Sequence, residues 1–241
     1  MCQLIDHFFG QTGPSDRNPY AAAARNRVMA NVFITGGTGY IGQRLIPELL
    51  ARGHVVRALV RNGSIAKLPA GAAAVPGNPL DRTTFAGEVA PSDTFVQLVG
   101  VPHPSPAKAQ QFRDVDLVSV TESAAASHAA GVRHFIYLSV AQPAPVMRDY
   151  VAVRAEGERL VRETGMAATF VRPWYVLGPG HRWPYLILPL YWLWALSPKS
   201  RETARRLYPV KLRNVVRAIG DAVNTPPNGV RIIEAPEMRR A

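Results

Sequence analysis

The residues best suited to chemistry are the glycines that recur between Thr35 and Gly42, in the run Thr-Gly-Gly-Thr-Gly-Tyr-Ile-Gly. An apolar run, Val32 to Ile34, comes directly before them, and apolar residues at helical spacing follow between Leu45 and Leu50. A strand, a glycine turn and a helix in this order present free main-chain N–H groups and the positive end of a helix to an anion. The run therefore predicts a turn that binds the pyrophosphate of a dinucleotide.

The three glycines of such a turn can be assigned in two ways. Gly37, Gly39 and Gly42 follow the general spacing of dinucleotide-binding turns, and Gly36, Gly39 and Gly42 follow a spacing with a wider first interval. In either assignment one glycine makes the tight turn, one lets the main chain approach phosphate oxygens and one lets helix and strand pack closely. A second apolar run, Val55 to Val60, lies where the next strand of the sheet is expected.

The elements that must position this turn alternate between strands and helices. Parallel strands joined by helices form a sheet with helices on both faces. We expect strands near 31–35, 55–60, 72–75, 94–99, 135–138 and 168–171, and helices near 41–52, 112–130 and 147–164. The pattern predicts an α/β fold with a Rossmann-like doubly wound parallel sheet over residues 30–180.

The two ends of the chain differ from this middle part. A very apolar stretch at 183–196 is followed by a basic segment, a helix near 213–224 and a strand at Val230–Glu234. We assign residues 181–241 to a small C-terminal lobe beside the carboxyl edge of the sheet, where ligands of such folds bind. Residues 1–29 are polar and rich in turn-forming residues, and we expect a poorly ordered extension there.

Composition narrows the class of protein. The chain has 241 residues and a formal net charge of +11, but its arginines are spread along the sequence, so we expect no nucleic-acid partner. The single cysteine, Cys2, excludes a disulfide framework and fits a reducing cytoplasm. Six scattered histidines lack the spacing of ligands, which predicts no metal site.

Four stretches carry a family likeness: the glycine run, Ala58 to Arg61, Val132 to Ser139, and Val171 to Pro173. They resemble the short-chain dehydrogenase/reductase superfamily, especially extended and atypical members such as the NmrA-like proteins and the NAD(P)H-binding accessory subunit of respiratory complex I. The resemblance implies a bound NAD or NADP, with Gly36, Gly39, Tyr40 and Ile41 around the pyrophosphate. Further cofactor contacts are expected from Gly37, Thr38, Gly42, Leu98, Val99, Gly100, Arg172 and Pro173.

The end of the second strand indicates which dinucleotide is preferred. An NAD-binding protein usually presents an acidic side chain there, which accepts hydrogen bonds from the ribose and would repel a 2′-phosphate. Here Val60 is followed by Arg61, whose guanidinium suits a phosphate, so we expect NADP(H) in preference to NAD(H). The alternative is an Arg61 that is merely solvated. Asn78, where relatives often carry an aspartate, is expected against the adenine.

The resemblance also implies a catalytic tyrosine with a lysine four residues later. Tyr150 and Arg154 have that spacing, which puts both side chains on one face of a helix, and arginine keeps the positive charge. Ser139 is the available partner hydroxyl, although the position aligned with the catalytic hydroxyl is Val140. The alternative gives these residues no catalytic role: Tyr150 is a partly buried tyrosine, and Arg154 forms an ion pair with Glu158.

The apolar stretch at 183–196 allows two interpretations. It is too short to span a membrane and contains two prolines. Its tryptophans and tyrosines, with arginine before and basic residues after, suit a helix lying in an anionic bilayer interface over residues 183–206. The alternative, which we favour, is a lid or core helix that closes an apolar substrate pocket.

These observations favour an NADP(H)-dependent oxidoreductase that acts on an apolar carbonyl or quinone by hydride transfer, with Tyr150 as the acid and Arg154 orienting the ribose. The rival is a non-catalytic dinucleotide-binding sensor or accessory protein, because Arg154 and Val140 depart from the family pattern. A third interpretation is a cytoplasmic protein that docks peripherally on a membrane.

Overall fold

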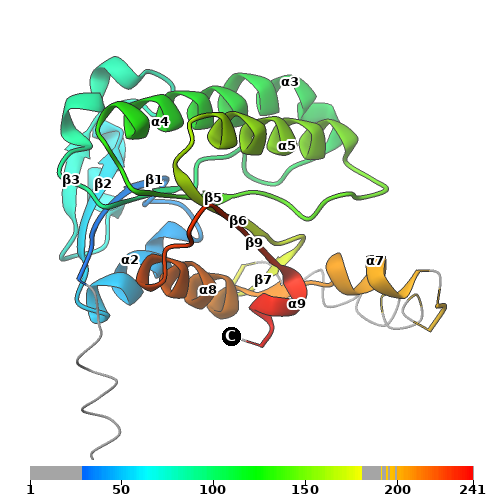
Figure 1. The fold of residues 1–241 in the computed structure, drawn as a ribbon. Coiled ribbons are helices and arrows are strands. Elements are labelled where there is room, and N and C mark those ends of the chain that lie inside the picture. Colours follow the sequence, from blue (N-terminus) through cyan, green and yellow to red (C-terminus); the bar gives the residue numbers. More distant parts are fainter. Residues whose placement is uncertain (1–28, 181–190, 192–193, 195, 199, 241) are drawn as a thin grey trace, which may run out of the picture.

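The computed structural model describes residues 29–180, 191, 194, 196–198 and 200–240 (Figure 1). The expectations for residues 1–28 and for the apolar stretch at 183–190 lie outside these residues. Within the described part, seven strands form one parallel sheet between two layers of helices (Figure 1). Every described helix falls short of the length or apolarity that crossing a bilayer requires.

The sheet is built outward from the strand before the glycine turn, β1 (Asn31–Thr35). The chain adds β2 (Val55–Val60) and β3 (Ala73–Pro76) on one side and then crosses to the other side of β1. There follow, in spatial order, β4 (Thr94–Gln97), β5 (His134–Leu138), β6 (Ala167–Arg172) and β9 (Val230–Glu234). The order reverses between β1 and β4, and folds of this class bind ligands at the carboxyl ends of such a strand pair.

Helices cover both faces of the sheet (Figure 1). On one face lie α2 (Gly42–Ala51), α8 (Leu212–Asn224) and α9 (Ala235–Met238), and on the other α4 (Val118–Ala129) and α5 (Arg148–Glu163). A short α3 (Ala109–Gln111) and a π-helical segment, η5 (Phe112–Leu117), lead into α4. Short 3₁₀ turns connect the remaining parts: η1 (Asn62–Lys67), η2 (Arg82–Thr84), η3 (Ala86–Glu88) and η4 (Pro106–Lys108).

Each layer buries its own apolar cluster against the sheet. On the α4 and α5 side, the rings of Phe33, Phe95 and Phe135 stack from strand to strand, with 5.3 Å between neighbouring ring centroids. On the α2 and α8 side, Leu45 and Ile219 are fully buried in a second cluster. Because both faces are covered, the central strands are continuous apolar runs, as expected for a parallel sheet.

The predicted doubly wound parallel sheet is confirmed, with small differences in element boundaries. The fourth strand ends at Gln97, two residues before the expected end, where the chain passes the glycine turn. The helix expected at 112–130 begins at Ala109 and includes the π-helical segment, which a 3.6-residue apolar period does not reveal. The fifth and sixth strands begin one residue earlier than expected.

Part of the segment that we assign to the small C-terminal lobe belongs to the main sheet. β9 pairs in parallel with β6, from Ala168 beside Val230 to Arg172 beside Glu234, and is the seventh strand of the main sheet. α8 shares the apolar cluster of α2. The composition change after residue 180 therefore does not mark the end of the Rossmann-like unit, because the chain returns to it at residue 212.

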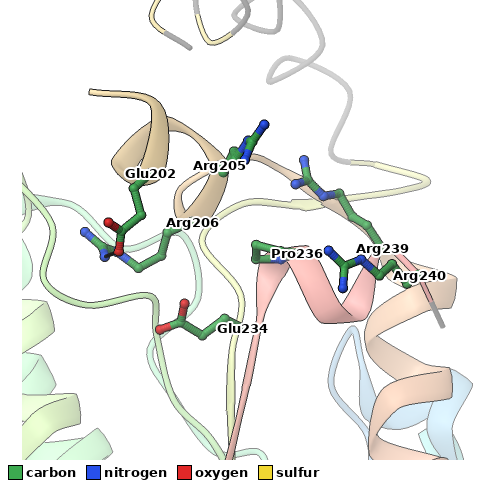
Figure 2. A pocket seen from close by; sticks show the side chains of 7 residues that line it. All are labelled: Glu202, Arg205, Arg206, Glu234, Pro236, Arg239 and Arg240. Atoms are coloured by element: carbon green, nitrogen blue, oxygen red, sulfur yellow. Dashed lines mark ion pairs between the residues drawn. The ribbon is translucent and has the colours of Figure 1, made fainter. Parts of the chain in front are cut away.

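A smaller structure occupies the described residues between β6 and α8. β7 (Val176–Leu177) and β8 (Val210–Lys211) form a two-stranded parallel sheet, and α7 (Arg201–Arg206) precedes β8. Between α7 and α9 lies a pocket of about 470 Å³ (Figure 2). This part of the chain brings a group of charged side chains to the carboxyl edge of the sheet.

Candidate functional site

The glycine turn packs so closely that side chains are excluded from it. A Cβ placed on Gly42 would overlap the Gly36 carbonyl oxygen and lie 2.6 Å from the Cα of Gly37. Gly36 has a φ of +75°, and a Cβ there would lie 3.0 Å from the carbonyl carbon of Leu98. Gly42 is thus the position that lets α2 approach the turn, and Gly36 lets the turn approach the chain beyond β4.

The turn leaves hydrogen-bond donors without partners. The N–H of Gly39 donates to the Gly36 carbonyl at 3.0 Å, but the N–H groups of Gly37, Thr38 and Ile41 donate to no main-chain acceptor among the described residues. Within the described part of the chain, the N-cap residue of α2 makes no side-chain capping hydrogen bond. Unpaired N–H groups and an uncapped helix start are what a phosphate anion requires, so the turn fits the pyrophosphate of a dinucleotide.

Two further segments close around the turn. The chain beyond β4, at Leu98 and Val99, lies directly against Gly36. On another side Gly178 faces the Tyr40 ring, since a Cβ on Gly178 would overlap the Tyr40 hydroxyl. The structure therefore brings the predicted cofactor residues at 36–42 and 98–99 together at the switch point of the sheet.

Arg61 and Asn78 lie at the far end of the expected cofactor site, after β2 and β3. Arg61 is exposed and forms no ion pair with the described residues. Asn78 is also exposed, and its side-chain oxygen accepts a hydrogen bond from the N–H of Leu80 at 3.1 Å. Arg61 is free to meet an anion, whereas the Asn78 oxygen that we expect at the adenine already holds a local turn.

Arg154 is buried beneath the chain beyond β4. Its guanidinium donates to Asp116 Oδ1 at 2.5 Å and to the Leu138 carbonyl at 2.8 Å, with side-chain exposures of 4% for Arg154 and 0% for Asp116. The other Asp116 oxygen accepts the Val101 N–H at 2.9 Å. A Cβ on Gly100 would overlap Arg154 Nη2, so glycine is needed for the chain to pass over the ion pair.

The charge of Arg154 is stabilised by its surroundings. Burial lowers the pKa of its guanidinium, but Tyr150, Tyr137 and Asp116 outweigh burial and raise that pKa above its usual value. Burial raises the pKa of the Asp116 carboxyl, against the opposing effects of Arg154 and the Val101 N–H. The result is a fixed cation below the chain at Gly100, which remains charged at any physiological pH.

Two tyrosine rings flank this cation. The Arg154 Cζ atom is 5.2 Å from the centroid of the Tyr150 ring and 5.6 Å from that of Tyr137. Complete burial raises the pKa of Tyr137 to about 12, which makes its phenol a poor proton donor. Tyr150 is only partly buried, at the start of α5. Its ring centroid lies 4.9 Å from that of Phe112. Of the two, Tyr150 is the more exposed.

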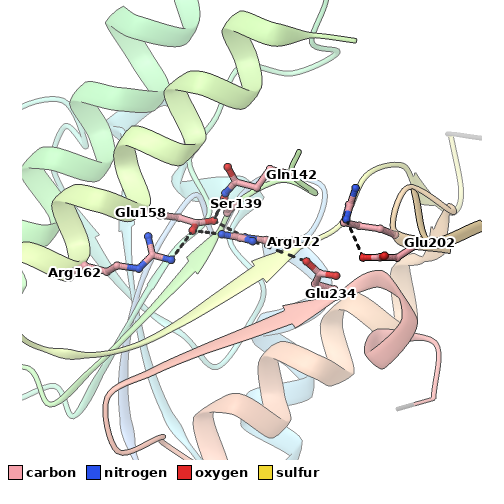
Figure 3. Close-up of polar contacts among 8 residues, drawn as sticks. Ser139, Gln142, Glu158, Arg162, Arg172, Glu202 and Glu234 are labelled. Atoms are coloured by element: carbon pink, nitrogen blue, oxygen red, sulfur yellow. Dashed lines mark hydrogen bonds and ion pairs between the residues drawn. The ribbon is translucent and has the colours of Figure 1, made fainter. Parts of the chain in front are cut away.

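Ser139 belongs to a different network, centred on Glu158 (Figure 3). The Ser139 hydroxyl donates to Glu158 Oε1 at 2.6 Å, and Gln142 donates to the same oxygen at 2.8 Å. Arg172 holds both Glu158 oxygens, at 2.8 and 2.5 Å, and Arg162 adds a contact at 3.0 Å. The Glu158 side chain is 1% exposed, so this is a buried carboxylate with all its acceptor sites filled.

The structure brings some of the predicted site residues together and separates others. Tyr150 and Arg154 are adjacent, as their spacing predicts. The Ser139 hydroxyl and the Arg172 guanidinium are both directed to Glu158, and the Pro173 carbonyl accepts the Ala141 N–H at 3.1 Å. The alternative in which Arg154 pairs with Glu158 is wrong in its partner, because Asp116 takes that place.

Asp116 is the residue that sequence reasoning missed. It lies in the π-helical segment, and its carboxylate is fully buried against Arg154 and the Val101 N–H. The one available signal is an acidic residue beside apolar ones, and Asp114, which is also next to Val115, is exposed. Glu158 is four residues after Arg154, so the sequence places it on the inner face of α5. Its partners could not be predicted.

The fold and the turn define a Rossmann-like dinucleotide-binding protein. A family model described as NAD(P)H-binding matches residues 36–181, which is more than half of the sequence, and the chain belongs to this family. The match confirms both the predicted family resemblance and a nicotinamide dinucleotide as the cofactor type.

Three curated relatives are reductases by name. The chain is 31% identical over 160 residues to the ceramide reductase of Caulobacter vibrioides, covering 62% of this chain and 47% of that protein. It is 28% identical over 168 residues to a ketoreductase of Stigmatella aurantiaca that acts on 4-hydroxy-2-methyl-3-oxo-4-farnesyl-3,4-dihydroquinoline-1-oxide, covering 61% and 50%. A 3-diazoavenalumate denitrifying reductase of a Streptomyces species is 33% identical over 178 residues, covering 62% and 57%. The chain thus spans about half the length of these relatives.

Solved structures share the fold. The enzyme WbmH of Bordetella bronchiseptica, solved with NAD⁺, superposes with a TM-score of 0.64 at 19% identity, covering 86% of this chain and 76% of that one. The UDP-glucose 4-epimerase of Thermotoga maritima gives a TM-score of 0.62 at 18% identity, covering 85% and 76%. At these identities the likeness supports the Rossmann-like architecture alone.

Proposed function

We propose that the chain is a reductase that uses NADPH to reduce an apolar carbonyl compound or quinone. The observation that carries the proposal is the pairing of Tyr150 with the buried Arg154 cation, next to the chain at Gly100 and on the same edge of the sheet as the glycine turn. The three relatives support a reductase, and two of them are named for a ceramide and a farnesyl-bearing substrate. The apolar character of those substrates agrees with the sequence expectation.

In this proposal the chain's own residues bind, orient and move a proton. The dinucleotide, held by the main chain of residues 36–42, supplies the hydride when bound. Tyr150 donates its hydroxyl proton to the carbonyl oxygen of the substrate, which becomes an alcohol. Arg154 lies close enough to the Tyr150 ring to stabilise the phenolate that remains, and Asp116 holds Arg154 in place.

The preference for NADPH rests on Arg61. Its exposed side chain follows β2, at the position where an acidic residue would favour NAD. A free guanidinium can pair with both oxygens of a 2′-phosphate, which NADH lacks.

A second candidate function is favoured by one specific observation. Ser139 donates to Glu158 within the buried network, and no hydrogen bond joins it to Tyr150 among the described residues. A protein that binds the dinucleotide without turnover, as a sensor or accessory module, would need the turn but not a catalytic hydroxyl.

One kinetic experiment separates the two functions. Oxidation of NADPH by the wild-type chain is followed spectrophotometrically with a panel of long-chain ketones, aldehydes and quinones. We expect turnover with at least one of them and a fall of about 100-fold or more in kcat for Tyr150→Phe, with NADPH affinity little changed.

Tyr208→Phe is the matched control, since it removes a hydroxyl from a tyrosine that packs beside Arg239 and far along the chain from α5. Its kcat should equal that of the wild type. Tight NADPH binding without oxidation by any acceptor would reject the reductase and leave the sensor. Equal losses in Tyr150→Phe and Tyr208→Phe would reject Tyr150 as the proton donor.

A further inference from the structure

The pocket between α7 and α9 is built almost wholly from charged side chains (Figure 2). Four arginines and two glutamates line it: Arg205, Arg206, Arg239, Arg240, Glu202 and Glu234. Two of the arginines come from α7 and two directly follow α9, so separate segments of the chain converge on one space of about 470 Å³.

Among the described residues, the two glutamates form an ion pair with one of these four arginines. Glu202 lies 3.6 Å from Arg206, and Glu234 lies 3.9 Å from Arg172, which is outside the pocket. Arg205, Arg239 and Arg240 have no carboxylate partner among the described residues. An excess of positive charge is therefore left in the pocket.

The arginines are also close enough to repel one another. Burial lowers the pKa of Arg239, the Tyr208 ring 4.7 Å away opposes this, and the neighbouring charges of Arg205 and Arg240 lower the pKa further. Gathering like charges costs free energy in the folded chain, and a bound anion would remove that cost. The arrangement thus has the electrostatics of an anion site.

We propose that this pocket binds the phosphate or diphosphate group of a ligand. Guanidinium groups pair with two phosphate oxygens at once, and several of them around one space favour a multiply charged anion over a single carboxylate. Glu234 ends β9, next to Arg172 at the end of β6, so the pocket lies at the carboxyl edge of the sheet, several strands away from the glycine turn. The site is separate from the proposed dinucleotide site and does not depend on the proposed function.

Calorimetric titration with inorganic pyrophosphate tests the proposal. The double variant Arg239→Gln, Arg240→Gln removes two exposed arginines at the end of the chain, and we expect its affinity to fall about tenfold or more. The matched control, Arg213→Gln with Arg217→Gln, removes two exposed arginines from α8 and the same net charge, and its affinity should match the wild type. Binding of pyrophosphate at the glycine turn would be equal in all three proteins.

A second arm identifies the source of the phosphate. Sedimentation with phosphatidylcholine vesicles, with and without phosphatidic acid, shows whether a lipid headgroup is bound through the same arginines. Loss of either pyrophosphate or phosphatidic acid binding in the Arg239, Arg240 variant alone supports the site and assigns its source.

Equal binding by the variant and the control in both arms, or equal loss in both, would overturn the proposal. Thermal unfolding checks that the double variant folds. If it does not, Arg205→Gln, an exposed position on α7, supplies the same test from the other wall of the pocket.

Discussion

The glycine turn and the inner face of α5 lie at the same edge of the sheet, but they differ in whether their polar groups have partners. At the turn, main-chain N–H groups and the start of α2 lack partners within the described chain. On α5, by contrast, Arg154 pairs with Asp116, and Glu158 is held by Arg172, Arg162 and Ser139. One region is open to an anion, whereas in the other the buried charged side chains are paired with one another.

Nucleotide binding and the stability of the folded chain therefore depend on different groups. Nucleotide binding depends on the absence of side chains and on donors that the fold cannot satisfy. The residues of α5 serve the folded state first, because a buried charge that loses its partner is costly. Tyr150, partly buried at the start of that helix, is the residue to which we assign the proposed proton transfer.

The largest effect is expected at the turn itself. In Gly42→Val the new side chain would overlap the main chain at Gly36 and Gly37, so α2 could not approach the turn. We expect calorimetry to detect no NADPH binding. Gly87→Ala, where an added Cβ meets no atom within 4 Å, is the matched control and should bind normally.

Gly39→Ala tests the same turn with a smaller steric change, in case Gly42→Val does not fold. In Gly39→Ala the added Cβ lies 3.1 Å from the Gly36 oxygen, a contact that a small shift can relieve. Its affinity should be intermediate between wild type and Gly42→Val. Unchanged NADPH affinity in both glycine variants would show that nucleotide binding does not depend on the close packing of the turn.

On α5 the expected effect is on stability. Asp116→Ala leaves the buried Arg154 cation without its carboxylate, which should lower the free energy of unfolding by about 3–5 kcal/mol in urea titrations. Asp114→Ala, two residues earlier and exposed, should change it by about 0.5 kcal/mol or less. Similar values for the two variants would show that the ion pair does not hold this region.

The smallest effect is expected at Arg61. Arg61→Ser should weaken NADPH binding about tenfold and leave NADH binding unchanged, because the 2′-phosphate loses one charge-assisted pair. Lys67→Ser removes a positive charge from the following 3₁₀ turn and is the control. A parallel loss for NADPH and NADH would mean that Arg61 does not select between them.

Most of the sheet could be predicted from the sequence because local patterns determine it. The apolar runs of β1 and β2 and the glycines that follow α4 and α5 are signals within a few residues of each element. The place of β9 could not be predicted, since its pairing with β6 joins residues about sixty positions apart. The composition change after residue 180 gives no sign that the chain later adds a strand to the main sheet.

The candidate site, too, could be predicted only where local patterns determine it. The turn is a contiguous motif, and the adjacency of Tyr150 and Arg154 follows from helical spacing. The alternative interpretation pairs Arg154 with Glu158, which has the right spacing, but Asp116 of the π-helical segment is the partner in the structure. Pairings across helices depend on packing angles and on the π-helical segment, which no local pattern records.

The position of β9 has a consequence for how the sheet is assembled as the polypeptide emerges from the ribosome. β6 ends at Arg172, and its outer neighbour is not synthesised until Val230. Until then β6 is an unprotected edge, with the N–H and C=O groups on one side available to any other extended chain. Shortening the polypeptide before residue 230 would make that exposure permanent and favour self-association.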